Sequence, residues 1–146
     1  MIDLLETIGE AWGWLGLDPK ELIASNAFGN VIVRGSDGRY WRICPEELAA
    51  TCLASSDEEL ARVRADPEFV QDWEMAALVS LAETMVGPLS DGHRFCLKIP
   101  SVLGGAYAAE NLGMISISEL ISFSGDLAKQ IRDLPDGSKL RLNIVD

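Results

Sequence analysis

Apolar residues at the start of the chain recur at the three- and four-residue spacing of a helix. This spacing runs through residues 3–15 and predicts an amphipathic helix that packs on the core. Asp18 is followed by a proline, a pair typical of a helix N-cap and first helical position, so a short helix is expected over 19–24. We therefore expect residues 1–27 to form an N-terminal helical segment.

Segments that predict strands follow later in the chain, some from turn residues and some from alternation of apolar and polar residues. Residues 31–34 and 39–43 flank a run of turn-forming residues and predict a β-hairpin. Residues 93–99 alternate up to a proline, and a short strand is expected around Ile115. Residues 139–144 also alternate and predict a last strand.

Helix-start signals separate these strands. Pro45 and two acidic residues indicate a new helix, and Ser56 begins a capping box. Asp66-Pro67 opens an apolar stripe that continues to about Val86, which predicts the longest and central helix. Ser116 begins another capping box, with a helix running to about Arg132.

These elements predict an α+β fold in which an antiparallel sheet of about four to five strands is packed with helices. The 146 residues contain 48% hydrophobic and 24% charged residues, close to the globular average and enough for one core. We find no repeat, linker or low-complexity tract, so residues 1–146 are expected to form a single domain.

The net charge of the chain argues against some classes of binding partner. The formal charge is −11, which repels nucleic acid and anionic lipid and attracts basic surfaces. No apolar run reaches the length of a membrane helix, and the first residues lack the pattern of a signal peptide, so a cytoplasmic protein is expected. The three cysteines, Cys44, Cys52 and Cys96, form no paired motif and are expected to be small core residues.

Candidate catalytic groups are few. The single histidine, His93, stands at a predicted strand start, and no phosphate-binding, zinc-protease or serine-hydrolase motif occurs. Paired carboxylates fall at helix starts, where capping accounts for them. We therefore expect no catalytic residues, no metal site and no cofactor, and a protein that acts by binding another protein.

Acidic residues crowd the stretch 46–72, where only Arg62 and Arg64 offset them, and such a surface would speed encounter with a basic partner. Adjacent Tyr40 and Trp41 must point to opposite faces of their strand, and one exposed ring would suit an interface. The alternative is a solvated helical face. The candidate partner-binding residues are Tyr40, Trp41, Glu46, Glu47, Asp57, Glu58, Glu59, Asp66, Glu68 and Asp72.

A glycine-rich stretch after the strand over 93–99 is a second candidate site, and its residues are Lys98, Pro100, Gly104, Gly105, Tyr107 and Asn111. The glycine pair fits either a turn with positive φ or a backbone that approaches a partner or small ligand. A rival function follows from the second interpretation, in which Gly104 and Gly105 with Tyr107, Asn111 and His93 bind a small molecule.

Three sequence blocks together resemble a known family, the C-terminal domain of Tdi-type immunity proteins of bacterial type VI secretion. The blocks are Phe28–Glu46, Phe95–Asn111 and Ser124–Lys139, with Lys-Ile-Pro-x-x-Leu-Gly-Gly and Leu-Pro-Asp-Gly in the same order. The resemblance covers 28–146 and implies a protein that binds a cognate toxin, a DNase in the best-known pairs, and silences it inside the producing cell. It brings no catalytic residues.

Members of that family often carry an additional N-terminal GAD-like domain, which we do not expect here because only about 27 residues precede the first block. The resemblance therefore leaves the toxin's identity open. Our hypothesis is a toxin-neutralising immunity protein. The alternatives are the small-molecule site described above and a regulatory or scaffold domain that binds another host protein.

Overall fold

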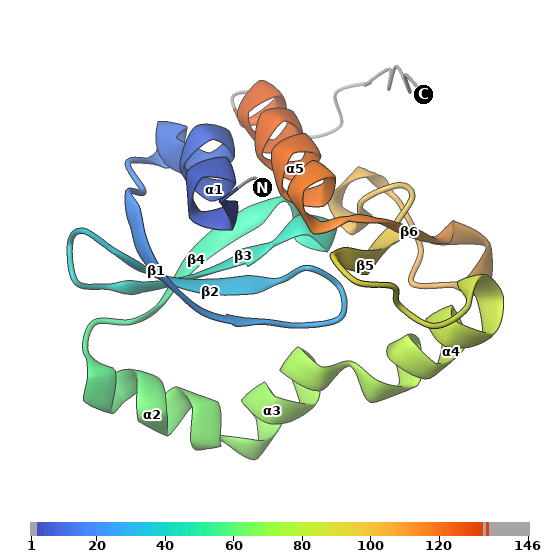
Figure 1. Cartoon of the computed structure of the whole chain (residues 1–146), viewed down its shortest axis with the longest axis horizontal. Helices are drawn as coiled ribbons and strands as arrows, with labels where there is room; N and C mark the ends of the chain where they lie inside the picture. The colour runs from blue at the N-terminus through green and yellow to red at the C-terminus, as the bar shows by residue number, and fades with distance from the viewer. Residues whose placement is uncertain (1–2, 133, 135–146) are drawn as a thin grey trace.

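The computed structural model describes residues 3–132 and residue 134 (Figure 1). The strand predicted over 139–144 lies outside the described residues. The strands are β1 (Pro19–Ser25), β2 (Val31–Gly35), β3 (Tyr40–Cys44), β4 (Ala49–Ala54), β5 (His93–Leu97) and β6 (Leu112–Ser116). The helices are α1 (Leu4–Trp12), α2 (Asp57–Ala65), α3 (Pro67–Glu74), α4 (Ala76–Val86) and α5 (Ile117–Ile131).

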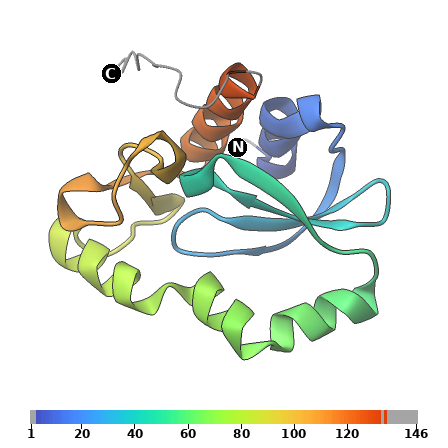
Figure 2. The same ribbon diagram turned by 180° about the vertical axis from the view of Figure 1, so that it is seen from behind.

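The strands form two antiparallel sheets. One has four strands in the order β1-β2-β3-β4, and the other pairs β5 with β6. Helices cover both faces of the larger sheet: α1 and α5 lie side by side on one face, and α2 and α3 run along the other (Figures 1 and 2). The predicted α+β class and the size of the antiparallel sheet are confirmed.

The core follows this layering. Alternate residues of β2 and β3 face α1 and α5, where the buried side chains include Val31, Val33 and Ile43. The opposite face buries Ile32 and Tyr40 beneath α2 and α3. A third cluster holds the smaller sheet against α4 and includes Phe28, Phe95, Leu97 and Leu112.

Local signals in the sequence predicted several elements correctly. The hairpin forms with Val33 opposite Trp41, and Gly38 in its turn has φ +81°. Side chains of Ser56 and Ser116 accept hydrogen bonds from backbone N–H groups three residues ahead, at 3.1 and 3.2 Å. These caps begin α2 and α5 where the sequence placed them.

The helix predicted over 19–24 is wrong, because these residues form β1. The segment pairs with β2, with Pro19 opposite Gly35 and Leu22 opposite Val33. Proline is tolerated there because β1 is an edge strand and Pro19 begins it. The N-terminal segment is therefore helical only up to Leu15, where a short 3₁₀ turn after α1 ends.

The helix predicted from Pro45 is a single 3₁₀ turn, Pro45–Glu47. Leu48 adopts a left-handed conformation with φ +49°, which stops the turn. The chain then continues as β4, which pairs with β3 and places Cys52 opposite Trp41. The prediction that all three cysteines lie in the core fails for Cys52, which is exposed on this edge strand.

The single helix predicted over 67–86 is broken in two. Met75 has φ +48° and separates α3 from α4. The carbonyl of Trp73, which a continuous helix would use internally, accepts a 2.9 Å hydrogen bond from the Asn26 side chain. Neither piece is central, and the longest helix is α5, with 15 residues. Within the described part of the chain, no helix is long and apolar enough to cross a membrane.

Candidate functional site

Most carboxylates of α2, α3 and the turn between them are exposed to solvent, as the sequence predicts. Arg62 and Arg64 are exposed among them, and Glu59 is half-buried. We call the exposed carboxylates of this segment the acidic face. They are Asp57, Glu58, Asp66, Glu68, Asp72 and Glu74.

Tyr40 and Trp41 point to opposite faces of the sheet, as expected for neighbours in a strand. Tyr40 is only 5% exposed and donates its hydroxyl hydrogen bond to the carboxylate of Asp57. This hydrogen bond raises the pKa of the Tyr40 phenol. Trp41 is half-buried against the core beneath α1 and α5. Tyr40 is therefore a link between the sheet and α2, and it offers little surface to a partner.

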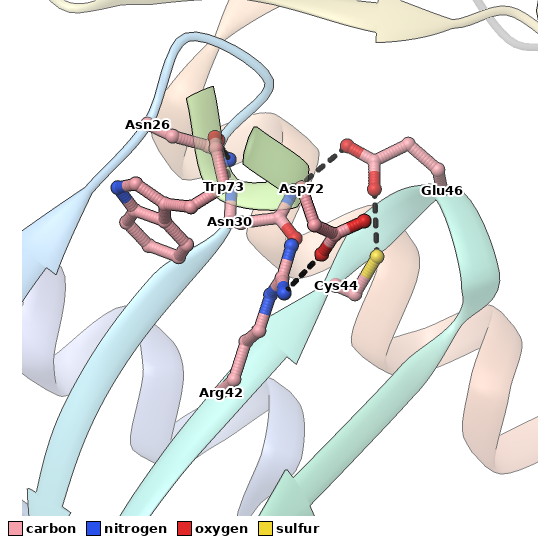
Figure 3. Close-up of polar contacts among 7 residues, drawn as sticks. All are labelled: Asn26, Asn30, Arg42, Cys44, Glu46, Asp72 and Trp73. Carbon is pink, nitrogen blue, oxygen red and sulfur yellow. Dashed lines mark hydrogen bonds and ion pairs between the residues drawn. The ribbon is translucent and has the colours of Figure 1, made fainter. Parts of the chain in front are cut away.

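Glu46 is also buried, with 3% of the residue exposed. Its carboxylate accepts hydrogen bonds from Asn30 Nδ2 at 2.8 Å and from the Cys44 thiol at 2.7 Å (Figure 3). Burial raises the pKa of Glu46, and these two hydrogen bonds oppose the rise. Burial and the neighbouring carboxylate also raise the pKa of the Cys44 thiol, so it stays protonated at neutral pH.

Arg42 connects this buried carboxylate to α3. Its Nε donates to Asn30 Oδ1 at 3.1 Å, and its Nη1 forms an ion pair with Asp72 at 2.7 Å (Figure 3). The guanidinium carbon lies 5.2 Å from the centre of the Trp73 ring and 5.8 Å from that of Phe69. A continuous polar chain thus runs from the acidic face through Arg42 to the buried carboxylate.

Asn26, Asn30 and Arg42 also belong to this site, although they were not among the residues predicted from the sequence. Asn26 organises the turn before β2, because its Oδ1 accepts from the backbone N–H groups of Phe28 and Asn30, each at 3.0 Å. The sequence did contain one signal for Arg42. It alternates with Tyr40 and Cys44 on one side of its strand, and the residues on either side of it in the sequence are apolar. A charged residue in that position needs a partner from another element.

A cleft of about 440 Å³ opens beside this polar chain. It lies where β3 and β4 meet the α3–α4 break and the loop that follows β5. Both polar and apolar groups line it, including Arg42, Glu47, Thr51, Asp72, Met75 and Tyr107. The cleft therefore joins Asp72 of the acidic face to Tyr107 of the glycine-rich stretch.

The glycine-rich stretch is a tightly held loop. Asn111 accepts a hydrogen bond from the Ile99 backbone N–H and donates to the carbonyls of Ile99 and Ala106, all at 2.9 Å. Gly104 has φ +94°, so it fits the interpretation as a turn with positive φ. A Cβ on Gly105 would lie 1.8 Å from the Ile99 carbonyl oxygen, so the close approach there is to the chain's own backbone.

The remaining candidates are spread around the loop. Pro100 is buried, whereas Lys98 is exposed and Tyr107 is 47% exposed. The His93 ring lies at the start of β5, with Nδ1 3.0 Å from the Asp91 carbonyl oxygen. The loop thus uses Asn111 to hold its own backbone, while Tyr107 faces the cleft. Among the described residues, no group of three or more histidine, cysteine or acidic side chains is placed to hold a metal ion.

Comparison with known proteins identifies the class. Residues 54–128, just over half of the chain, match the family described as T6SS immunity protein Tdi1, C-terminal. The chain belongs to this family of type VI secretion immunity proteins. The match runs from the end of β4 into α5, so it includes the acidic face and the glycine-rich loop. No curated protein matches the chain.

A solved structure shares the fold. The crystal structure of Atu4351 from Agrobacterium tumefaciens aligns with a TM-score of 0.56 at 15% sequence identity. The alignment covers 84% of this chain and 62% of that chain. The chain thus spans less than two thirds of the length of that protein, and at this identity the likeness concerns the fold alone.

Proposed function

We propose that this protein protects the bacterial cytoplasm by binding a cognate type VI toxin and neutralising it. Membership of the immunity family carries the proposal. The binding surface we propose is the acidic face together with the adjoining cleft. The acidic face lies within the region that matches the family, and the cleft lies partly within it, through Asp72, Met75, Leu78 and Tyr107. Both are open to solvent.

Charge supports a basic toxin as the partner. The chain has a formal charge of −11, and the acidic face gathers exposed carboxylates on two consecutive helices. Enzymes that cleave nucleic acid need basic surface to bind phosphate, so a DNase is the toxin class that this surface suits best. Of the predicted contact residues, Glu47, Asp57, Glu58, Asp66, Glu68 and Asp72 are exposed and remain in the proposed surface.

In this mechanism the protein acts as a competitor and carries out no reaction. A surface rich in carboxylates imitates the charge of the phosphate backbone and accelerates encounter with the toxin. Once bound, it would cover the basic groups that the toxin needs. Tyr40 and Glu46, both predicted as contacts, instead hold the surface in shape from beneath.

Co-expression tests the proposal. The toxin encoded beside this gene is induced in cells with and without the chain, and survival is counted. A catalytically silenced toxin is used in parallel to isolate a complex by size-exclusion chromatography. We expect survival and a stable complex. Equal killing with and without the chain, and no complex, would refute the proposed function.

A further inference from the structure

The cleft carries more negative than positive charge. Glu46, Glu47 and Asp72 line it, whereas Arg42 is its only cation among the described lining residues. The Arg42 side chain is 12% exposed and already paired with Asp72, whose own side chain remains 66% exposed. Because Glu47 is also exposed, one accessible carboxylate lines the cleft in addition to Asp72, the carboxylate that pairs with Arg42.

The dimensions and walls of the cleft suit a long cationic side chain. A cleft of about 440 Å³ has room for a side chain of a partner. Met75 and Leu78 offer apolar atoms for a methylene stem. Tyr107 lines the same cleft with 47% of the residue exposed, and an aromatic ring attracts a cation over its face.

The walls are fixed before any partner arrives. Asn26 holds the α3–α4 break through the Trp73 carbonyl at 2.9 Å. Asn111 holds the loop of Tyr107 through the backbone of Ile99 and Ala106. A site whose shape is already set loses little conformational entropy when it binds.

We infer that this cleft receives an arginine side chain of the toxin, an inference that rests on the proposed function. Arginine fits better than lysine because its planar, forked guanidinium can bind carboxylates through several donors and can stack on an aromatic ring. Glu47 and Asp72 would accept hydrogen bonds from the guanidinium, and Tyr107 would cover its face.

The affinity of the purified toxin for cleft variants, measured by isothermal titration calorimetry, tests this inference. Glu47→Gln and Tyr107→Ala should each weaken binding about tenfold, as loss of one charged or aromatic anchor does. Thr51→Arg places a guanidinium in the cleft from an exposed position and should weaken binding about thirtyfold or more. Glu10→Gln and Ser122→Arg make the same charge changes at exposed positions of α1 and α5 and serve as matched controls.

A second measurement identifies the partner group. Each arginine of the toxin is replaced by glutamine, and affinities are measured against wild type and Glu47→Gln in double-mutant cycles. One arginine should couple to Glu47 by about threefold or more. Unchanged thermal midpoints confirm that the variants fold. If Thr51→Arg does not fold, the Glu47→Gln variant alone carries the test.

The results of these measurements distinguish a failure of the arginine site from a failure of the proposed function. If wild type binds the toxin and the cleft variants bind as tightly as their controls, the arginine site is wrong while the proposed function stands. The arginine site is equally wrong if no arginine of the toxin couples to Glu47. If wild type itself does not bind the toxin, both the function and the site fall.

Discussion

Replacing Gly105 by alanine should destabilise the loop beside the cleft far more than the same change at its neighbour. The new Cβ would lie 1.8 Å from the Ile99 carbonyl oxygen, 2.6 Å from the Ile99 carbonyl carbon and 2.8 Å from Asn111 Nδ2. Backbone atoms cannot rotate away, so the two segments must separate. Overpacking of this kind costs about 1–3 kcal/mol, and each Asn111 hydrogen bond that breaks adds about 1 kcal/mol.

With two of the three Asn111 hydrogen bonds lost, Gly105→Ala should lower the free energy of unfolding by about 3–5 kcal/mol. Gly104→Ala is the matched control, because a Cβ there meets nothing within 4 Å. Its cost comes only from the φ of +94° and should be about 1–2 kcal/mol.

Urea unfolding followed by tryptophan fluorescence measures both variants, and the slopes of the transitions show whether the midpoints can be compared. The reasoning is refuted if Gly105→Ala is as stable as wild type, or if Gly104→Ala is the more damaging of the two. Either result would mean that the loop is not held by its contact with Ile99.

Three further variants test other parts of the structure by the same unfolding measurement. A Cβ on Gly125 would lie 2.4 Å from the Ala11 carbonyl oxygen, so Gly125→Ala should force α5 away from α1 and cost about 2–3 kcal/mol. Arg42→Met removes the ion pair with Asp72, the hydrogen bond to Asn30 and the contacts with two aromatic rings, and should cost about 2–3 kcal/mol of stability. The stability of Arg42→Lys should fall between that of Arg42→Met and that of wild type. Burial raises the pKa of Glu46 in the folded state, so its contribution to stability is full at low pH and is lost as pH rises through the raised pKa. Glu46→Gln should therefore gain on wild type as pH rises above the ordinary range of a carboxyl group.

Each of these has an outcome that would contradict it. Gly13→Ala meets nothing within 4 Å and should leave stability nearly unchanged, so equal losses at Gly13 and Gly125 would dismiss the helix contact. Equal stability of the lysine and methionine variants at Arg42 would show that charge does not matter there. A pH-independent difference between Glu46→Gln and wild type would show that the buried carboxylate does not titrate as its raised pKa requires.

Local chemistry in the sequence determined the elements that were predicted correctly. Ser56, Asp66 and Ser116 begin helices because their side chains cap the following N–H groups, and this needs only neighbouring residues. The hairpin is equally local, since Gly38 supplies the positive φ in the turn between its two strands.

The failures have nonlocal causes. Residues 19–25 become a strand because β2 pairs with them, although Asp18 and Pro19 match a helix start. The break at Met75 carries no glycine or proline, and it coincides with a hydrogen bond from Asn26, far away in the sequence. Pairing partners of this kind cannot be read from a local pattern.

In the candidate site, too, the locally determined features could be predicted from the sequence and the features that depend on distant residues could not. Carboxylates on α2 and α3 are exposed because charged side chains on a helix surface stay hydrated, so the sequence predicted the acidic face well. Glu46 differs because Asn30, from the turn before β2, and Cys44 supply hydrogen bonds that permit its burial. The cleft needs three distant segments and could not have been predicted from any one of them.

The affinity of the purified chain for its toxin at low and high salt tests the central claim most directly. If a carboxylate-rich surface covers a basic toxin, binding should be tight at about 50 mM salt and should weaken by about tenfold or more at about 500 mM. A complex whose affinity does not change with salt, or no complex at all, would contradict the account.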